Sequence, residues 1–304
     1  MSDLKFAQVF APSTIANISV GFDLLGMSVP VIGDSIKVTK IKKNEIIIKS
    51  IHGDNGKLSK VIEENTAGKP IQSMLFDAKV SWGVEIEIKK GIPLSSGLGG
   101  SASSAVAAVV AMNRLLGDLY NKEQLLEYAL DGEEIASGAR HADNIAPALY
   151  GGLVACLHSG KVYPLSLPKE IFCLLVHPDI QINTKEARDI LKNEISHAKW
   201  IEQSSCLLGF MTGIALNNKD IIFNNLKDVI ITPQRKHLIA PFENIAKIVE
   251  KYNGTDLGIS GAGPTMFSLF KSKEAAEQAA LNLGDYKTYV SEVPGAGAFV
   301  EKEG

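Results

Sequence analysis

The stretch at residues 93–104 reads PLSSGLGGSASS, and its glycines and serines separate two runs of different character. Before it, residues 84–88 alternate apolar and acidic side chains with a period of two, which predicts a strand. After it, residues 105–116 are mostly small and apolar, which is typical of a buried helix. A glycine-rich turn that opens a helix gathers backbone N–H groups at the positive end of the helix dipole, and this favours phosphate binding.

The residues of this turn leave two interpretations open. One is an ordinary strand–helix connection capped by serine, and the other is a phosphate loop in which serine hydroxyls add donors or hold a metal. The stretch is not a Walker loop, because no Gly-Lys-Ser/Thr follows, and Ala102 stands where the last glycine of G-x-G-x-x-G belongs. Support for phosphate binding must therefore come from elsewhere in the chain.

The composition is that of a globular protein with a substantial core. Of 304 residues, 45% are hydrophobic and 21% are charged, so we expect two domains, at residues 1–167 and 168–304. The net charge of −3 gives no reason to expect nucleic acid or an anionic membrane as a partner.

The chain also carries signals about its compartment. Residues 1–5 lack the apolar core of a signal peptide, and no apolar run is long enough to span a bilayer. Cys156, Cys173 and Cys206 are far apart and odd in number, which predicts buried free thiols. A reducing environment suits free thiols, so we expect a cytoplasmic protein.

Residues 12–26 form the first polar stretch with two interpretations. They follow a predicted strand at residues 5–11 and set polar side chains between glycines and apolar anchors. The stretch is either a surface loop with Asn and Asp turns or a substrate-binding loop. In the second case Thr14, Asn17 and Asp23 offer hydrogen bonds to a polar ligand.

Acidic residues and a histidine follow the glycine turn. Glu133 and Glu134 end a predicted helix at residues 121–136; they are either solvated, or one of them faces the serines and holds magnesium. His141 and Asp143 are either a base with its orienting carboxylate or part of a structural turn.

Other predicted elements frame these stretches. Residues 35–40 and 45–49 predict a hairpin, and residues 171–176 an apolar strand. Thr184 is placed to be the N-cap of a helix. Arg188 and Arg235 are either solvated or clamp a carboxylate through their guanidinium groups.

Three stretches, in order along the chain, resemble the motifs of the galactokinase–homoserine kinase–mevalonate kinase–phosphomevalonate kinase superfamily. They lie at residues 12–26, 93–104 and 260–265. Within that superfamily the chain is similar to the homoserine kinases, through residues 16–23, 141–147, 233–235 and 260–265.

The resemblance implies an α+β fold with two domains. The N-terminal domain would be ribosomal-protein-S5-domain-2-like, with a left-handed β-α-β unit that no sequence rule would propose. The C-terminal domain would be ferredoxin-like. A homodimer is a further expectation from the family.

By position, the resemblance implies a binding site for L-homoserine. Asp23 would meet the substrate ammonium, and Arg188 and Arg235 would meet its carboxylate. The complete set of substrate-binding residues would be Thr14, Asn17, Asp23, His141, Thr184, Arg188 and Arg235.

The resemblance also implies ATP and Mg²⁺ as cofactors. Ser101 and Glu133 would coordinate Mg²⁺, and Asn65 and Lys90 would lie near the nucleotide. The phosphates would be surrounded by Pro93, Ser95, Ser96, Gly97, Leu98, Gly99, Gly100, Ser101, Ala102, Ser103, Gly261 and Gly263. Homoserine kinases usually have Gly-Leu-Gly-Ser-Ser-Ala here, and this chain has Gly100 at the first serine. We therefore expect backbone N–H groups to bind phosphate at that point.

The implied reaction transfers the γ-phosphoryl group of ATP in line to the side-chain hydroxyl of L-homoserine, a step of threonine biosynthesis. Asn144, Glu133 and Ser101 would be the catalytic residues. Asn144 stands where mevalonate kinases carry a catalytic Asp, and an Asn cannot act as a general base. Homoserine kinases are thought to lack one, and a loose transition state needs little proton removal before the P–O bond breaks.

Two alternatives stand beside this prediction. One is a kinase of the same fold for another small alcohol such as mevalonate, which Asn144 and the two arginines argue against. The other is a catalytically inactive metabolite-sensing regulator, which an intact set of Ser101, Glu133, Asp23 and His141 argues against.

Overall fold

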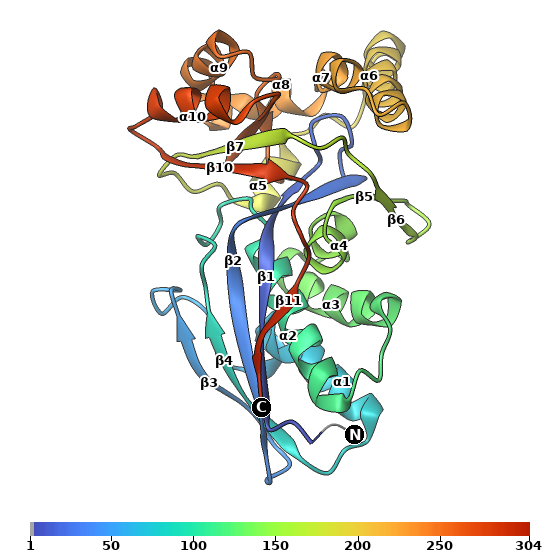
Figure 1. Ribbon diagram of the computed structural model, residues 1–304, viewed down its shortest axis with the longest axis vertical. Coiled ribbons are helices and arrows are strands. Elements are labelled where there is room, and N and C mark those ends of the chain that lie inside the picture. The colour runs from blue at the N-terminus through green and yellow to red at the C-terminus, as the bar shows by residue number, and fades with distance from the viewer. Residues whose placement is uncertain (1–2) are drawn as a thin grey trace.

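The computed structural model describes residues 3–304, which form two β-sheets with helices packed against them (Figure 1). The larger sheet has seven strands in the order β11-β1-β2-β4-β3, with β5 paired to β2 and β6 paired to β5. These strands are β1 (Phe6–Ala16), β2 (Leu25–Ile41), β3 (Ile46–His52), β4 (Gly83–Lys89), β5 (Leu153–Cys156), β6 (Val162–Leu165) and β11 (Phe299–Glu303).

Helices cover one face of this sheet (Figure 1). They are α1 (Gly68–Ala78), α2 (Gly100–Leu116), α3 (Lys122–Ser137) and α4 (Ala142–Tyr150). α2 is the most deeply buried of them, and its small side chains let it pack closely against β1 and β2. The strand predicted at residues 84–88 and the helix predicted at residues 105–116 are both confirmed.

β1 is longer than predicted. It continues through Pro12 to Ala16, so the first residues of the expected loop belong to the strand. The register against β2 shifts between Pro12 and Ser13. Proline has no backbone N–H to donate, and a local irregularity lets a strand accommodate it.

The hairpin predicted from residues 35–40 and 45–49 is wrong. β4 lies between β2 and β3; it pairs antiparallel to β2 and parallel to β3. The connection from β3 to β4 contains η1 (Ile62–Glu64) and α1, so these elements form a β-α-β unit. The alternating apolar residues of β4 are buried at this central position, and tertiary packing therefore overrides the local turn.

The second sheet has four strands in the order β10-β7-β9-β8, with every pair antiparallel. They are β7 (Ile171–His177), β8 (Gly258–Ile259), β9 (Met266–Phe270) and β10 (Lys287–Val293). Numbered along the chain from β7, this order is 4-1-3-2, the ferredoxin-like arrangement. The α+β fold with two parts is confirmed.

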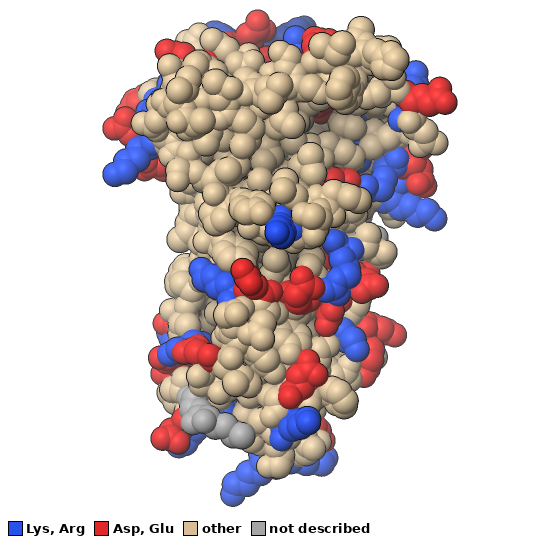
Figure 2. Space-filling model, turned by 90° about the vertical axis from the view of Figure 1, so that its right-hand side faces the viewer, with Lys and Arg blue, Asp and Glu red and all other residues tan. Residues whose placement is uncertain are grey.

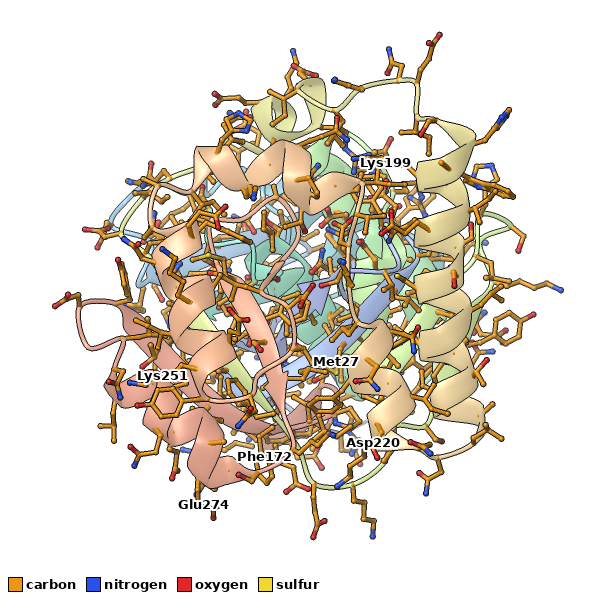
Figure 3. The ribbon with its side chains drawn as sticks, turned by 90° about the horizontal axis from the view of Figure 1, so that it is seen from above. Met27, Phe172, Lys199, Asp220, Lys251 and Glu274 are labelled. Atoms are coloured by element: carbon orange, nitrogen blue, oxygen red, sulfur yellow. The ribbon has the colours of Figure 1, made fainter. Side chains whose placement is uncertain are left out.

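Helices flank this sheet and complete the upper half of the molecule (Figure 1). They are α5 (Thr184–Asp189), α6 (His197–Ala215), α7 (Lys219–Asn225), α8 (Ile231–Arg235), η2 (Lys236–Leu238), α9 (Phe242–Lys251) and α10 (Lys273–Leu281). Seen from above, Lys199, Asp220, Lys251 and Glu274 mark α6, α7, α9 and α10 around Met27 of β2 (Figure 3).

The N-cap of α5 is Asn183, so the prediction of Thr184 as the cap is wrong. Asn183 accepts hydrogen bonds from the N–H groups of Lys185 (2.8 Å) and Glu186 (3.4 Å). Asn is a better N-cap than Thr, and Thr184 becomes the first residue of the helix.

The last strand returns to the first sheet. β11 pairs with β1, and the N–H of Lys5 donates to the carbonyl of Gly304 at 2.5 Å, so the first described residues lie beside the C-terminus near the bottom of Figure 1. The domain boundary at residues 167–168 stays a prediction, but residues 299–303 belong to the N-terminal sheet. Residues 1 and 2 of the segment considered as a leader lie outside the described range.

Three further features concern surface and core. No helix within residues 3–304 is both long and apolar enough to cross a membrane. The three cysteines are free, as predicted, and Cys206 is only half-buried. On the face shown in Figure 2, basic and acidic side chains lie interspersed, so this face has no field of one sign.

Candidate active site

The turn at residues 93–99 has the backbone of an anion-binding loop. Positive φ angles occur at alternate residues: Ser95 (55°), Gly97 (77°) and Gly99 (65°). When positive and negative φ angles alternate along the backbone, successive N–H groups point to the same side. They then form a concave nest that binds an anion. α2 begins directly afterwards at Gly100, with Gly99 as its N-cap and no side-chain cap. The first amides and the dipole of α2 can therefore serve a phosphate.

Three consecutive carbonyl groups of this loop, at residues 96–98, are held by the rest of the protein. Their donors are, in order, the Thr265 N–H (3.2 Å), the Ser260 hydroxyl (2.6 Å) and the Thr14 N–H (3.1 Å). The N-terminal loop and the C-terminal glycine turn, both predicted as parts of the site, thus meet the phosphate loop directly.

A pocket of about 230 Å³ lies at the N-terminus of α2. Of the residues predicted to bind ligand, it is lined by Asn65, Lys90, Pro93, Ser95, Ser96, Gly97, Gly99, Gly100, Ser101, Ala102, Glu133, Asn144, Thr184 and Gly261. The buried hydroxyl of Ser96 has no hydrogen-bond partner among the described residues. Buried polar groups are normally satisfied, so a ligand oxygen in this pocket would complete its contacts.

Ser101 and Glu133 line this pocket from α2 and α3, as the predicted metal site requires. Glu134 points elsewhere: its carboxylate is exposed and lies 3.8 Å from the guanidinium of Arg140. The structure therefore favours Glu133 over Glu134 as the carboxylate at the phosphate loop.

Three residues predicted to bind phosphate do not line the pocket. Ser103 donates its hydroxyl to the Ala11 carbonyl (2.6 Å) and is buried against the sheet. Leu98 inserts its side chain into the apolar core. A Cβ atom on Gly263 would meet Ile259, Ile239 and Ile182, which belong to the apolar core of the C-terminal sheet. Ser103, Leu98 and Gly263 pack against the sheet or the core and do not line the pocket. Their positions give no support to the prediction that they contact phosphate.

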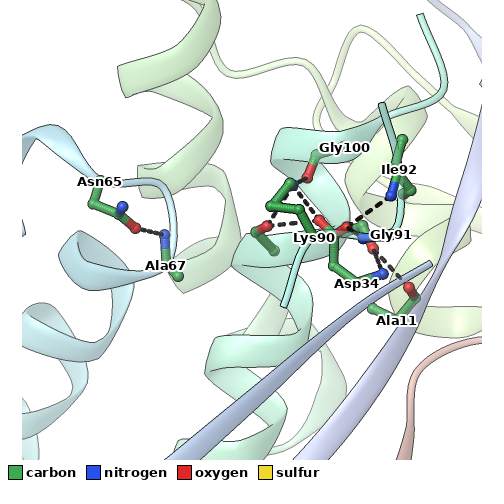
Figure 4. Close-up of polar contacts among 10 residues, drawn as sticks. Ala11, Asp34, Asn65, Ala67, Lys90, Gly91, Ile92 and Gly100 are labelled. Carbon is green, nitrogen blue, oxygen red and sulfur yellow. Dashed lines mark hydrogen bonds and ion pairs between the residues drawn. The ribbon is translucent and has the colours of Figure 1, made fainter. Parts of the chain in front are cut away.

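Asn65 and Lys90 border the pocket with polar groups that other parts of the protein already use. Asn65 donates to the Ser59 carbonyl (2.7 Å) and accepts from the N–H of Ala67 (2.9 Å). Lys90 forms a buried ion pair with Asp34, and Figure 4 shows this pair together with the Asn65–Ala67 contact.

Asn144 reaches the same pocket from the first turn of α4. Its Oδ1 accepts a hydrogen bond from the Thr14 hydroxyl at 2.7 Å. The Nδ2 group of Asn144 is then the part of the side chain that can serve a ligand. Thr14 thus acts on the pocket through Asn144.

A cluster of opposite charges lies beside the phosphate loop. Arg188 donates from both terminal nitrogens to the two carboxylate oxygens of Asp23, each at 3.0 Å. Arg235 is buried and donates to the carbonyls of Ala187 (2.7 Å) and Gly261 (3.0 Å). The ring of Phe22 lies 5.6 Å from the Arg188 guanidinium and 5.2 Å from that of Arg235. Arg–aromatic contacts of this kind keep the two cations aligned.

Asn17 connects this cluster to the loop. It donates to the Gly261 carbonyl at 3.1 Å and accepts from the Asp23 N–H at 3.0 Å. Asn17, Ile18 and Ser19 all have positive φ angles (73°, 42° and 52°). Such backbone is unfavourable for a β-branched residue, and strain of this kind occurs where a site needs a particular geometry.

Burial and neighbouring charges shift the pKa values of the ionisable groups in and beside this cluster. Burial lowers the pKa of Arg235 to about 10, and the charge of Arg188 adds to the effect. The hydrogen bond with Asp23 raises the pKa of Arg188. Burial raises the pKa of Asp143 to about 7, with the charge of Asp23 as a second cause. Both arginines are therefore charged at neutral pH, whereas Asp143 titrates there.

His141 does not line the phosphate pocket. Together with Asp23 it lines a second hollow, of about 490 Å³, beside the turn that joins β5 to β6. His141 is the N-cap residue of α4 but makes no side-chain capping bond. The structure thus brings His141 and Asp23 to one hollow, and Thr184 to the phosphate pocket.

Sequence reasoning missed the functional positions of Phe22, Asp34 and Asp143. Phe22 lies within a motif stretch, but the sequence assigned it no function. Asp143 was considered only as the carboxylate that could orient His141. Asp34 follows a glycine, which is typical of a turn, yet β2 runs straight through it. The available signal was that Asp34 is the one acidic residue within this long strand.

The chain is similar to known proteins over most of its length. Residues 65–152 match the family of GHMP kinases N terminal domain, and residues 210–288 match GHMP kinases C terminal. A homoserine kinase of Xylella fastidiosa is 42% identical over 274 residues, which cover 90% of this chain and 85% of that relative. The chain belongs to the homoserine kinase family. The resemblance seen in the sequence is therefore confirmed.

Two more relatives support this membership. A homoserine kinase of Xanthomonas campestris pv. campestris is 39% identical over 91% of this chain and 86% of its own length. The crystal structure of a homoserine kinase from Cytophaga hutchinsonii is similar with a TM-score of 0.94 and 37% identity, over 99% of this chain and 98% of that one. A mevalonate kinase of L. major has a TM-score of 0.70 at 14% identity, which shows a common fold alone.

Proposed function

We propose that this protein transfers the γ-phosphoryl group of ATP to the side-chain hydroxyl of L-homoserine, giving O-phospho-L-homoserine and ADP for threonine biosynthesis. The observation that carries this proposal is the position of the Asp23–Arg188 pair and Arg235 beside the phosphate loop. Arg235 donates to the carbonyl of Gly261, and Gly261 lines the phosphate pocket. An α-amino acid carries its ammonium and carboxylate on one carbon, so adjacent acidic and basic side chains match it.

The zwitterion of the acceptor would bind with each charge paired. Its carboxylate would take donors from Arg235 and Arg188, which offer planar, two-pronged contacts. Its ammonium would approach Asp23. On binding, the substrate ammonium would take over part of the pairing of Asp23, and the substrate carboxylate would take over part of the pairing of Arg188. Each charge would therefore keep an opposite charge beside it. An acceptor such as mevalonate lacks the ammonium, and this alternative is not favoured.

Alignment and electrostatics would supply most of the rate. The amide of Asn144 can orient the acceptor hydroxyl, because its oxygen is already fixed by Thr14. Holding that hydroxyl in line with the γ-phosphate lowers the entropic part of the barrier. Backbone N–H groups of the loop and α2 stabilise the charge on the phosphoryl oxygens, and no general base is needed before bond cleavage.

Ser101 and Glu133 fit a magnesium ion bound together with a nucleotide. Within residues 3–304, no group of three or more His, Cys, Asp or Glu side chains could hold a metal. Mg²⁺ typically uses one or two protein oxygens and completes its shell with water and substrate phosphates. When bound, Mg²⁺ would neutralise charge on the phosphates of ATP.

Two accompanying inferences concern location and assembly. The free cysteines suit a cytoplasmic location. A homodimer stays a prediction from the family. The alternative of a catalytically inactive regulator is not favoured, because the relatives that match over most of the chain are homoserine kinases.

The direct test is ADP release with Mg²⁺ and ATP against L-homoserine, L-serine, L-threonine and mevalonate. We expect rapid turnover with L-homoserine and at most slow turnover with the others. Turnover with mevalonate alone would overturn the acceptor assignment. ATP binding without turnover on any acceptor would overturn the assignment as an enzyme.

A further inference from the structure

The carboxylate of Asp34 lies at the base of the phosphate loop, fully buried in β2. Its Oδ1 accepts hydrogen bonds from the N–H groups of Gly91 (3.0 Å) and Ile92 (3.2 Å), where the chain enters the loop. Its Oδ2 accepts from the Ser104 hydroxyl (2.7 Å) and from Lys90. Figure 4 shows these contacts gathered at one carboxylate.

The ammonium of Lys90 uses its hydrogen-bonding capacity inside the protein. Besides Asp34, it donates to the Gly100 carbonyl (2.7 Å) and to the Ser104 hydroxyl (2.8 Å). The Lys90 side chain is 3% exposed. An ammonium has three donors, so these contacts account for all of them.

These contacts join the two ends of the loop. Gly91 and Ile92 precede it, and Gly100 and Ser104 belong to the first turns of α2. We propose that Asp34 and Lys90 are positioning residues, whose buried ion pair closes the phosphate loop at its base and holds the N-terminal amides of α2 towards the phosphates of ATP. This inference rests on the proposed function, because it assigns the loop to ATP.

The energetic reason is preorganisation. A loop that contains Gly97 and Gly99 loses much conformational freedom when it orders around a ligand. Contacts that order it beforehand remove this cost from binding and keep the donors aimed during phosphoryl transfer. The pair is internal to the protein and adds no net charge, so its effect reaches the ligand through the backbone.

The competing role for Lys90 is a direct contact with the nucleotide. Such a contact would draw the ammonium away from Asp34 and leave a buried carboxylate without its counter-ion. Separating a buried pair in this way is strongly unfavourable, whereas replacing both partners with neutral groups is often tolerated. The two roles therefore differ in what a double substitution does.

The experiment compares the parent with Asp34→Asn, Lys90→Met and the double variant. Titration calorimetry measures the affinity for Mg²⁺ with ADP, and steady-state kinetics measures KM for ATP and for L-homoserine. We expect each single substitution to weaken nucleotide affinity about ten-fold or more, with KM for L-homoserine changed by less than about three-fold. The double variant should recover a large part of the lost nucleotide affinity.

A buried polar residue near the far end of α2 provides the matched control. Asn113 exchanges two hydrogen bonds of 2.9 Å with the backbone of Tyr120 at the other end of the helix. Asn113→Ala should lower the melting temperature and leave nucleotide affinity unchanged. If the single variants behave like this control once folded, the positioning role is wrong.

Two other results are decisive. If the double variant binds nucleotide as poorly as Lys90→Met while Asp34→Asn binds normally, Lys90 contacts the nucleotide directly and the proposal is overturned. If the parent binds ADP but does not phosphorylate L-homoserine, the proposed function fails, yet the calorimetric comparison still decides the role of the pair.

Discussion

The Thr14 hydroxyl donates a hydrogen bond to Asn144 Oδ1 at 2.7 Å, although the two residues are 130 positions apart in the chain. The contact joins the end of β1 to the first turn of α4 directly against Gly99. A Cβ atom on Gly99 would overlap the Thr14 hydroxyl and lie 2.9 Å from Asn144 Oδ1. The phosphate loop, the N-terminal strand and α4 therefore meet here with no room for a side chain.

Gly99→Ala should abolish most activity. Gly99 has a φ of 65°, and the added methyl group would also displace Thr14 or Asn144. We expect kcat/KM to fall by about 100-fold or more, since positioning errors at a reacting centre are costly. Gly56→Ala is the matched control: its φ is 71°, but no atom lies within 4 Å of the new Cβ. A Gly99→Ala enzyme as active as the Gly56→Ala control would contradict this packing.

Gly100→Ser should be tolerated. The new Cβ would lie 3.3 Å from Ile92 Cγ2, which a small movement of that side chain accommodates. The variant restores the serine usual in the family's loop, so we expect equal or slightly lower KM for ATP. Gly97→Ser should inactivate the enzyme, because its Cβ would lie 2.5 Å from the Ser260 carbonyl oxygen. Steady-state kinetics on both variants tests these two predictions. A strongly raised KM for ATP in Gly100→Ser would contradict the first and show that only backbone amides can bind phosphate at residue 100.

Arg188→Met should weaken binding of L-homoserine selectively. The substitution removes a two-pronged contact to a carboxylate, so we expect KM for L-homoserine to rise about 10- to 100-fold. KM for ATP should change little. Arg114→Met, which removes ion pairs with Asp118 and Glu303 far from the site, serves as the control. Equal effects on both substrates would show that Arg188 supports the fold of the site instead of the acceptor.

Glu133→Gln should raise the Mg²⁺ concentration needed for half-maximal activity, because Glu133 lines the phosphate pocket. The neighbouring Glu134→Gln changes the same kind of group on the exposed side of α3 and should leave the requirement unchanged. A titration of activity with Mg²⁺ distinguishes them. An unaltered requirement in Glu133→Gln would remove this residue from the metal site.

Asp143→Asn should change how stability depends on pH. An unfolded Asp titrates near pH 4, whereas the folded pKa is about 7. Between these values the folded protein holds a proton that the unfolded chain has lost. The free energy of unfolding therefore falls as pH rises through this range. The amide introduced by the substitution cannot ionise, so the melting temperature of the variant should rise relative to that of the parent as the pH increases from about 4 to about 7.

A control accompanies the measurement at Asp143. The hydrogen bond from Lys271 lowers the pKa of Asp220, which is fully exposed. Asp220→Asn should therefore show no such gain at higher pH. If the melting temperatures of Asp143→Asn and the parent differ by the same amount at every pH, the pKa of Asp143 is not raised.

Local patterns predicted much of the fold. The strand at residues 84–88 and the helix at residues 105–116 could be predicted from the local pattern of side chains, because that pattern depends only on residues close together in the sequence. The hairpin at residues 35–49 failed because a strand from later in the chain, β4, takes the place beside β2. Sheet order depends on which apolar faces can be buried together, and that is a property of the whole chain.

At the site, too, local properties could be predicted from the sequence and long-range contacts could not. Motif residues and their chemistry were accessible from the sequence, because glycines that permit positive φ and cations that match a carboxylate carry those properties individually. Contacts such as Arg188 with Asp23, separated by 165 positions, were not. Buried ion pairs such as Lys90 with Asp34 also escaped, because nothing in a sequence tells a buried lysine from an exposed one.

The sequence by itself predicted a glycine-rich turn at the start of a helix, because that pattern follows from residue types at short spacing, and its three motif stretches resembled those of a kinase superfamily. Only the tertiary structure decided which groups face the ligand. Ser101 lines the pocket while Ser103, two residues on, bonds to Ala11 in the sheet. Residues two apart point to different sides of a helix, and the packing of α2 against β1 and β2 selects the side that meets the phosphate.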